Sequence, residues 1–394
     1  MTDVLILGGG IAGLSVAYDL GQRGIAFVLL ERSARAGGVI LSEQVEGFTI
    51  DAGPDALLVQ KPDAIRLCDE LGLGPRLIPT SPPRLAYVQR GGRLHALPAA
   101  SVLGIPTRLG PFVTTGLFSW SGKLRMAAEV GIPRRTDGAD ESIGAFMRRR
   151  FGAEACTYLA EPLLAGIHAG DVDRLSVRSL FPRLVDAERT HGSLLRAFRA
   201  QRPGPAAADG AFRSLQGGLS EMVRALTARL PAGSVRLDTE VREIAAEPTC
   251  GFAAISRNGD VHRARALVLA TPTFVTGALL RTLDTPLAAA CDEIPYASTA
   301  TVVLGYRRTD VAHPLNGSGF VVPRAEGSSI LAGSWMSSKW PDRAPAGKVL
   351  LRAFVGGTRD PVALDRSDAE LVDRSLAALR PLLGIRGDPI LTRV

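Results

Sequence analysis

The chain has 394 residues, of which 46% are hydrophobic and 22% are charged, and its formal net charge is +7. This length exceeds what a single hydrophobic core usually supports, so the sequence predicts two domains. No uninterrupted apolar run is long enough to span a bilayer, and no secretory signal precedes the first strand, so we expect a cytoplasmic protein. The four cysteines lack the spacing of a zinc site or a disulfide framework, which predicts buried thiols.

The positive charge is concentrated in one region. Residues 81–215 hold 19 Lys and Arg against 11 Asp and Glu. Such a segment can attract an acidic small molecule, an anionic membrane face or nucleic acid. No basic motif interleaved with aromatic residues accompanies the charge, so we do not expect a nucleic-acid partner. Because 42 of the 46 cationic residues are Arg, a coding bias is the alternative explanation of the excess.

A strand, a glycine turn and a helix open the chain in the order typical of a dinucleotide-binding unit. The apolar run Val4–Leu7 predicts a strand buried on both faces. Gly8, Gly10 and Gly13 follow with GxGxxG spacing, which gives a tight turn, room for a pyrophosphate and close packing of helix on strand. The helix that begins at Ile11 would point its N-terminal amides and its dipole at the phosphates.

The next strand ends at an acidic residue. The apolar run 25–30 predicts this strand, and Glu31 follows it where a carboxylate accepts the ribose hydroxyls of a dinucleotide. Arg35, Gly37 and Gly38 then form an RxGG sequence, whose glycines let a second backbone loop approach the same ligand. This arrangement favours FAD, a longer cofactor held from two sides. NAD, or a glycine-rich turn without a ligand, remains the alternative.

Beyond residue 81 the pattern changes several times along the chain. "RLAYVQRGGRLHALP" predicts a hairpin around its Gly-Gly pair, and residues 110–199 are mainly helical in pattern. Residues 201–210 have the composition of a loop, and a second hairpin is predicted around Asn258 and Gly259. The chain is β-rich from Ile294, and a last helix is capped at Ser367.

These elements predict an α/β protein in which two domains are interleaved along the chain. A Rossmann-like, FAD-binding domain comprises residues 1–81 and 216–290. The substrate domain has a mixed sheet from residues 291–394 and a helical insertion, residues 82–215, that faces the substrate or a membrane. The apolar stretch 101–120 is either a peripheral contact with the inner face of the membrane or a lid or core of the helical part.

Three later stretches carry a family resemblance. "EPLLAGIHAGDVDRLSVRSLFPRL" (161–184), "GSWMSSKWPDRAPAGKVLLRAFVGG" (333–357) and "GGLSEMVRALTARL" (217–230) resemble signatures of the oxygen-dependent protoporphyrinogen and coproporphyrinogen III oxidases, within the FAD-containing amine oxidase superfamily. With the N-terminal block, the resemblance spans nearly the whole chain. It implies an FAD enzyme of haem biosynthesis that oxidises a porphyrinogen with O2 as acceptor and H2O2 as product.

The motifs and the resemblance together imply a set of site residues. The predicted cofactor-binding residues are Gly8, Gly9, Gly10, Ile11, Ala12, Gly13, Glu31, Arg32, Arg35, Gly37, Gly38, Val39, Gly53, Pro54, Asp55, Ala56, Val241 and Ala270. The predicted substrate residues are Arg84, Gly166, Ile167, Val321, Ala332 and Phe354. Among these, Arg84 would pair with a propionate and Val241 would face the adenine.

No catalytic residue is assigned, because the resemblance implies that hydride passes to flavin N5 and the pyrrole nitrogens lose the proton. His168 is therefore not taken as a general base. Each substrate assignment has a plainer alternative, namely a helix C-cap for Gly166, an exposed arginine without a role for Arg84, and core packing for the apolar residues.

The end of the chain and the choice of substrate remain open. Members of the family continue beyond the last helix with a glycine-rich strand and a helix N-terminus that close over the flavin. The chain stops at Val394, inside a predicted strand, so we expect a truncated protein that binds FAD weakly. An amine oxidase, a carotenoid desaturase and a non-catalytic flavoprotein are the competing interpretations. The sequence leaves protoporphyrinogen and coproporphyrinogen unresolved, and predicts no oligomeric state.

Overall fold

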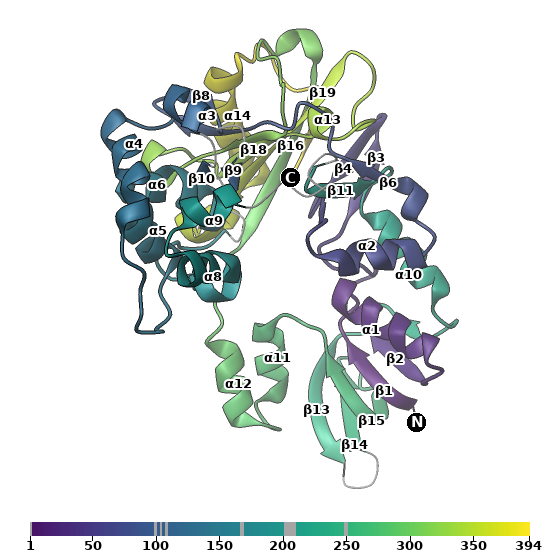
Figure 1. Cartoon of the computed structure of the whole chain (residues 1–394). Coiled ribbons are helices and arrows are strands. Elements are labelled where there is room, and N and C mark those ends of the chain that lie inside the picture. Colours follow the sequence, from purple (N-terminus) through teal and green to yellow (C-terminus); the bar gives the residue numbers. More distant parts are fainter. Residues whose placement is uncertain are drawn as a thin grey trace. The chain divides into compact units, whose positions relative to one another are not determined.

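The computed structural model describes residues 2–97, 101–102, 105–106, 109–165, 169–200, 210–247 and 251–394 (Figure 1). Contacts divide the chain into two units. Unit 1 comprises Met1–Ile78 and Phe212–Tyr296, and unit 2 comprises Pro79–Ala211 and Ala297–Val394. Each unit is built from two separate stretches of sequence, which confirms the predicted interleaved α/β architecture. The predicted helical and β-rich segments of the substrate domain belong to the same unit.

Unit 1 contains a six-stranded sheet in the order β12-β2-β1-β15-β14-β13. Strands β12, β2, β1 and β15 run parallel, whereas β14 and β13 continue the sheet antiparallel. The predicted hairpin around Asn258 joins β14 to β15. The strands are β1 (Thr2–Leu7), β2 (Phe27–Leu30), β12 (Val235–Arg236), β13 (Val241–Glu247), β14 (Gly251–Ser256) and β15 (Val261–Leu269).

Helices cover both faces of this sheet. Ile6 of β1 is buried in one core cluster with Leu14 of α1 and Leu226 of α10. Its neighbours Leu5 and Leu7 point to the other face, because side chains alternate along a strand, and lie in a second cluster that includes residues of α11. The helices of unit 1 are α1 (Ile11–Gln22), α2 (Pro62–Glu70), α10 (Ser220–Arg229), α11 (Thr273–Leu280) and α12 (Thr285–Asp292).

Two smaller sheets complete unit 1. The first is a hairpin, and the second has the order β5-β11-β6. Their strands are β3 (Ser42–Val45), β4 (Phe48–Asp51), β5 (Leu57–Leu58), β6 (Leu77–Pro79) and β11 (Phe212–Leu215).

Unit 2 contains a seven-stranded sheet in the order β20-β16-β19-β18-β17-β7-β8. Neighbours are antiparallel except β17 and β7, which are parallel. The predicted Gly-Gly hairpin is the pair β7 and β8. The strands are β7 (Ala86–Arg90), β8 (Arg93–Ala96), β16 (Thr299–Arg307), β17 (Gly319–Val321), β18 (Ala332–Trp335), β19 (Lys348–Gly356) and β20 (Leu391–Arg393), with a separate short pair β9 (Ser101–Val102) and β10 (Ile105–Pro106).

Two hydrophobic clusters pack against this sheet. Helix α14, which has a complete capping box at Ser367, packs with Leu304 and Leu351 in one cluster. The helices of the insertion, of which α4, α5, α6, α8 and α9 gather in one group in Figure 1, form the other cluster together with Val88 of β7. The helices of unit 2 are α3 (Leu109–Thr114), α4 (Trp120–Ala127), α5 (Ile143–Phe151), α6 (Ala153–Ala155), the π-helical segment Cys156–Ala165, α7 (Val177–Leu180), α8 (Pro182–His191), α9 (Leu194–Ala200), α13 (Met336–Lys339) and α14 (Asp368–Leu383).

Two further expectations concern membrane spans and the burial of the cysteines. Within the described segments, no helix combines the length and the hydropathy needed to cross a bilayer. Cys68 and Cys156 are buried as predicted, but the prediction is wrong for Cys291, which is partly exposed near the end of α12. That short helix buries Ala288 and leaves most of its other residues at the surface. Cys250 lies outside the described residues.

Candidate functional site

The glycine turn after β1 brings three backbone segments into close contact. Gly8 has φ of +106°, and a Cβ added there would lie 2.7 Å from the carbonyl oxygen of Ala270. A Cβ on Gly13 would lie 1.9 Å from the carbonyl oxygen of Gly8. Both positions therefore need glycine. Gly8 needs it for its positive φ and its close contact, and Gly13 needs it for its close contact alone. The result is a helix N-terminus held against the carboxyl ends of β1 and β15.

Gly10, the N-cap of α1, has the opposite environment. A Cβ built on Gly10 would meet nothing within 4 Å, and its φ is an ordinary −70°. Neither the turn nor the packing of the protein requires glycine here. The space beside it faces the free amides at the start of α1, which is where a pyrophosphate binds in this kind of unit. The absence of a side chain at Gly10 thus leaves room for a ligand beside these amides, and we call this space the nucleotide cradle.

The second glycine pair joins this cradle. The amide of Gly37 donates to the carbonyl of Gly9 at 2.7 Å, and a Cβ on Gly38 would lie 3.2 Å from Cα of Gly10. Arg35 is exposed and donates to the carbonyls of Gly38 and Ile40 at 2.6 and 3.1 Å. In this structure Arg35 therefore holds the shape of its own loop.

The acidic residue at the end of β2 is buried and oriented. Glu31 is 8% exposed and accepts hydrogen bonds from the amides of Gly9 at 2.6 Å and Ser33 at 2.8 Å. A carboxylate has about four lone-pair positions, so two remain for hydroxyl groups of a ligand. The carbonyl of Glu31 also accepts the amide of Thr239 at 2.8 Å, which holds the start of β13, and hence Val241, near this end of the sheet.

A further loop closes on the first from residue 53 onward. A Cβ on Gly53 would lie 1.9 Å from the carbonyl oxygen of Val39, so the two loops touch through their backbones. Val39 itself is 78% exposed. Asp55 is buried, whereas Pro54 is exposed and Ala56 is intermediate. Ile11 is partly buried, and Ala12 and Arg32 are exposed.

The sequence reasoning missed the contacts that fix this loop. Asp51 is 1% exposed, and its Oδ1 accepts the hydroxyl of Ser42 at 2.6 Å and the amide of Leu219 at 3.1 Å. The backbone amide of Ser42 donates to the hydroxyl of Ser220, and the backbone amide of Ser220 donates to the hydroxyl of Ser42. These bonds join β3, β4 and the N-terminus of α10. Sequence separations of 168 and 178 residues hide them, and the signal that remained was a polar residue beside each glycine motif.

Three of the predicted substrate residues form one row across the sheet of unit 2. Val321 is paired with Ala332, and Ala332 is paired with Phe354, so the three lie side by side on adjacent strands. The row continues to Val88, which packs in the helical cluster. Directly paired residues share a face, and all three predicted residues are partly buried. They form a continuous, mainly apolar strip, in which Val321 packs against the helical cluster and the guanidinium of Arg352 lies over the Phe354 ring.

The remaining substrate predictions lie apart from the row or outside the described residues. Arg84 is exposed, and its Nε donates to the carbonyl and hydroxyl oxygens of Thr80 at 3.1 and 3.2 Å. It stands in the segment before β7. Gly166, Ile167 and His168 lie outside the described residues.

The family follows from the sequence and the fold together. Residues 11–394 match the family model of the flavin-containing amine oxidoreductases, and the chain belongs to this family. It is 35% identical to coproporphyrinogen III oxidase of Bacillus subtilis (strain 168), covering 99% of this chain and 85% of that protein. It is 34% identical to coproporphyrinogen III oxidase of Staphylococcus aureus, covering 100% and 86%.

A solved structure agrees with this assignment. The putative protoporphyrinogen oxidase from Exiguobacterium sp. 255-15 superposes with a TM-score of 0.89 at 31% identity, covering 100% of this chain and 85% of that one. The predicted resemblance, the fold class and the flavin are thereby confirmed. The chain is an FAD-dependent oxidoreductase, and the open space at Gly10 and the oriented carboxylate of Glu31 fit the nucleotide half of that cofactor.

Proposed function

We propose that this chain oxidises coproporphyrinogen III to the porphyrin, with O2 as acceptor and H2O2 as product, and that protoporphyrinogen IX is a poorer substrate. The observation that carries the proposal is the identity of 33 to 35% to proteins named coproporphyrinogen III oxidase, over at least 79% of their length. The basic balance of residues 81–215 supports the same choice, because coproporphyrinogen carries four carboxylates and protoporphyrinogen two.

The cofactor-binding role of the predicted residues is part of this proposal. Glycines at positions 8, 10 and 13 bring backbone amides to the pyrophosphate, and Glu31 accepts the ribose hydroxyls. Gly37, Gly38 and Gly53 let two further loops approach from the other side. When bound, FAD accepts two electrons as hydride in each of three cycles and passes them to O2. The task left to the protein's own residues is to bind and orient the substrate and to exclude water.

The apolar row supports a flat macrocycle as substrate. Val321, Ala332 and Phe354 give a mainly apolar surface against which a tetrapyrrole ring can stack and shed water, with the guanidinium of Arg352 over the Phe354 ring at its end. Arg84, exposed in front of β7, binds a carboxylate by a charge-assisted bond. The proton leaves the pyrrole nitrogens once the ring is oxidised, so this proposal requires no protein base.

An anaerobic titration tests the function directly. The full chain is loaded with FAD, purified by gel filtration and mixed with coproporphyrinogen III or protoporphyrinogen IX while the flavin absorbance is followed. We expect bleaching by both, faster with coproporphyrinogen, and kcat/KM ratios in the same order. The same run measures how much FAD stays bound. If neither compound bleaches the flavin, the proposed function is wrong. The substrate would then be an amine or a carotenoid, or the protein would have no substrate.

A further inference from the structure

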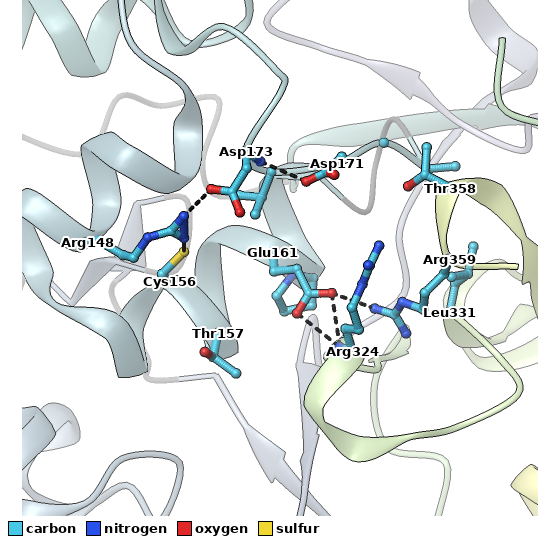
Figure 2. Close-up of a pocket in the computed structure, with 14 residues that line it drawn as sticks. Arg148, Cys156, Thr157, Glu161, Asp171, Asp173, Arg324, Leu331, Thr358 and Arg359 are labelled. Atoms are coloured by element: carbon cyan, nitrogen blue, oxygen red, sulfur yellow. Dashed lines mark hydrogen bonds and ion pairs between the residues drawn. The ribbon is translucent and has the colours of Figure 1, made fainter. Parts of the chain in front are cut away.

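A pocket of about 260 Å³ lies wholly within unit 2 (Figure 2). Its walls come from α5, the π-helical segment Cys156–Ala165, residues 169–173, the connection between β17 and β18, and the turn that follows β19. Three arginines and three carboxylates share the lining. They are Arg148, Glu161, Asp171, Asp173, Arg324 and Arg359. The partners of each charge therefore decide what kind of ligand the pocket suits.

Within the described residues, only one of the two terminal nitrogens of the Arg359 guanidinium donates hydrogen bonds. Its Nη2 donates to Glu161 at 3.0 Å and to the carbonyl of Val322 at 2.6 Å. Its Nη1 is buried and has no hydrogen-bond partner among the residues that the structure describes. Burial lowers the pKa of Arg359, Glu161 opposes this change, and the charge of Arg324 adds to it. A buried donor without an acceptor is costly, so the geometry calls for one.

Glu161 is the carboxylate that both arginines share. Its two oxygens each accept the backbone amide of Arg324 at 3.0 Å, and one of them also accepts Arg359. The guanidinium of Arg324 makes no hydrogen bond or ion pair within the described part of the chain, and Figure 2 shows it reaching toward the middle of the pocket. Glu161 thus pairs with the guanidinium of Arg359 and with the backbone of Arg324, and the second guanidinium leaves this end of the pocket positive.

The acidic residues on the opposite wall have partners of their own. Asp173 forms an ion pair with Arg148, and its amide donates to Asp171 at 2.9 Å. Arg148 also donates to the sulfur of Cys156 at 3.3 Å. The pocket is therefore polarised, with Asp171 at one end and the arginines at the other. An anionic group would bind at the arginine end and would point away from Asp171.

The arginine end lies where the apolar row stops. Val322, whose carbonyl accepts Arg359, follows Val321 directly. Leu331 lines the pocket, precedes Ala332 and donates its amide to the carbonyl of Phe354 at 2.7 Å. Val321 is thus next to Val322, Ala332 is next to Leu331, and the carbonyl of Phe354 accepts the amide of Leu331. A molecule stacked on the row and carrying a carboxylate arm can place that arm here.

We propose that Arg324 and Arg359 bind a carboxylate arm of the tetrapyrrole, with Glu161 acting as the positioning residue that holds both. This inference rests on the proposed function and adds a second carboxylate site to the one proposed at Arg84. Arg359 would donate its unused Nη1, and Arg324 would supply the second charge. A substrate with more carboxylate arms would use both sites, which gives a structural reason for preferring coproporphyrinogen.

Variants of the two arginines test this assignment in the FAD-loaded full chain. Arg324→Gln removes an exposed charge without disturbing the core, so we expect a coproporphyrinogen KM roughly 3- to 10-fold higher, with kcat within about twofold. Arg359→Lys keeps the charge but loses the planar fork, and we expect about a tenfold rise in KM. Arg374→Gln is the matched control, because it removes an arginine of the same unit that pairs with Asp360 outside the pocket.

Binding of coproporphyrin III, followed by fluorescence, gives a readout independent of turnover. Its Kd should rise in both pocket variants and stay unchanged in Arg374→Gln. Inorganic phosphate distinguishes a free anion from a tetrapyrrole arm. If phosphate raises the Tm of the wild type but not of Arg324→Gln, and both proteins bind coproporphyrin equally, the pocket serves a free anion and the proposal is wrong.

The two proposals fail in different ways. If the wild type oxidises coproporphyrinogen and both pocket variants behave like Arg374→Gln, the second carboxylate site is wrong and the function stands. If the wild type oxidises neither porphyrinogen, the function is wrong and this inference goes with it. A rise in KM for both pocket variants, with flavin content and Tm unchanged for Arg324→Gln, supports the site.

Discussion

The two units form their candidate sites in different ways. In unit 1 the contacts that define the nucleotide cradle come mostly from backbone groups of one short segment, such as the carbonyl of Gly9 with the amide of Gly37 and the amide of Gly9 with the carboxylate of Glu31. In unit 2 the charged pocket and the apolar row combine side chains from strands and helices far apart in sequence, such as Glu161 and Arg359, 198 residues apart. A cofactor that is read by backbone geometry leaves a local sequence signal, whereas a substrate surface built from side chains does not.

The buried charges of unit 2 give the comparison its largest expected effect. Glu129 and Arg150 are both 0% exposed and form an ion pair, and Glu129 also accepts the amides of Leu194 and Leu195 at the start of α9. Glu129→Gln leaves the buried Arg150 with only its longer ion pair to Glu188, at 3.5 Å, which should cost up to about 3 to 5 kcal/mol of the free energy of unfolding. Urea denaturation followed by circular dichroism measures the change.

The control for that measurement is a surface pair in the same unit. Asp388 is 91% exposed and pairs with Arg380, so Asp388→Asn should change the free energy of unfolding by less than about 1 kcal/mol. Similar losses in the two variants would mean that unit 2 does not depend on its buried charge network.

The nucleotide cradle in unit 1 should respond in the opposite way, with binding lost and folding kept. A Cβ at Gly10 meets no protein atom within 4 Å, so we expect Gly10→Val to leave the Tm nearly unchanged. The new methyl groups would occupy the proposed pyrophosphate position, and we expect FAD affinity to fall by roughly 100-fold, or about 2.7 kcal/mol. Flavin absorbance and the Tm of the purified protein report the two effects separately.

Gly131 in unit 2 provides the matched control, since its Cβ would also meet nothing within 4 Å and its φ is not positive. Gly131→Val should keep both FAD and Tm. Retention of full flavin by Gly10→Val would show that the open space is not where the cofactor binds.

The contrast also explains how much the sequence could predict. The glycine turn, Glu31 and the RxGG loop were recognisable because glycines and one acid at fixed spacing are needed for backbone reasons within a short segment. The hairpins at Gly91 and Asn258 and the cap at Ser367 follow from equally local turn and capping chemistry.

What the sequence could not predict depends on register and on distant partners. The row of Val321, Ala332 and Phe354 was proposed from the resemblance alone, because three apolar residues in three strands look like any core until the pairing is known. The Asp51 and Ser42 network left only polar residues beside glycine motifs as a signal, and the pair of Glu161 with Arg359 left none. Polar residues of that kind become interpretable once the fold brings them together.

The apolar row should respond with a moderate loss of turnover. Ala332→Trp places a large ring between Val321 and Phe354, where the macrocycle is proposed to stack. We expect kcat/KM for coproporphyrinogen to fall about tenfold, with FAD content unchanged, because the substitution lies in the other unit. Ala369→Trp on exposed α14 is the control and should keep activity. Equal activity of the two variants would contradict the row as a substrate surface.

The smallest expected effect tests how much unit 1 depends on one charged contact between distant residues. Glu221, in the first turn of α10, accepts two hydrogen bonds from Arg76, 145 residues earlier, and one from the amide of Gly217. The bond from Arg76 lowers the pKa of Glu221 below its ordinary value of 4.5, whereas burial opposes this change. Because Arg76 is half exposed, Glu221→Gln should cost only about 1 kcal/mol at neutral pH.

The pH dependence gives this prediction its sign. A carboxyl whose pKa is lowered by folding stabilises the folded state above its unfolded pKa, and that stabilisation is lost as the pH falls through the lowered, folded value. Wild-type stability should therefore decline as the pH falls from about 5 to below 4, and the decline should be shallower in Glu221→Gln. Parallel curves for the two proteins would mean that the bond from Arg76 contributes nothing. The loops of unit 1 would then hold α10 through Asp51 and the two serines without help from this ion pair.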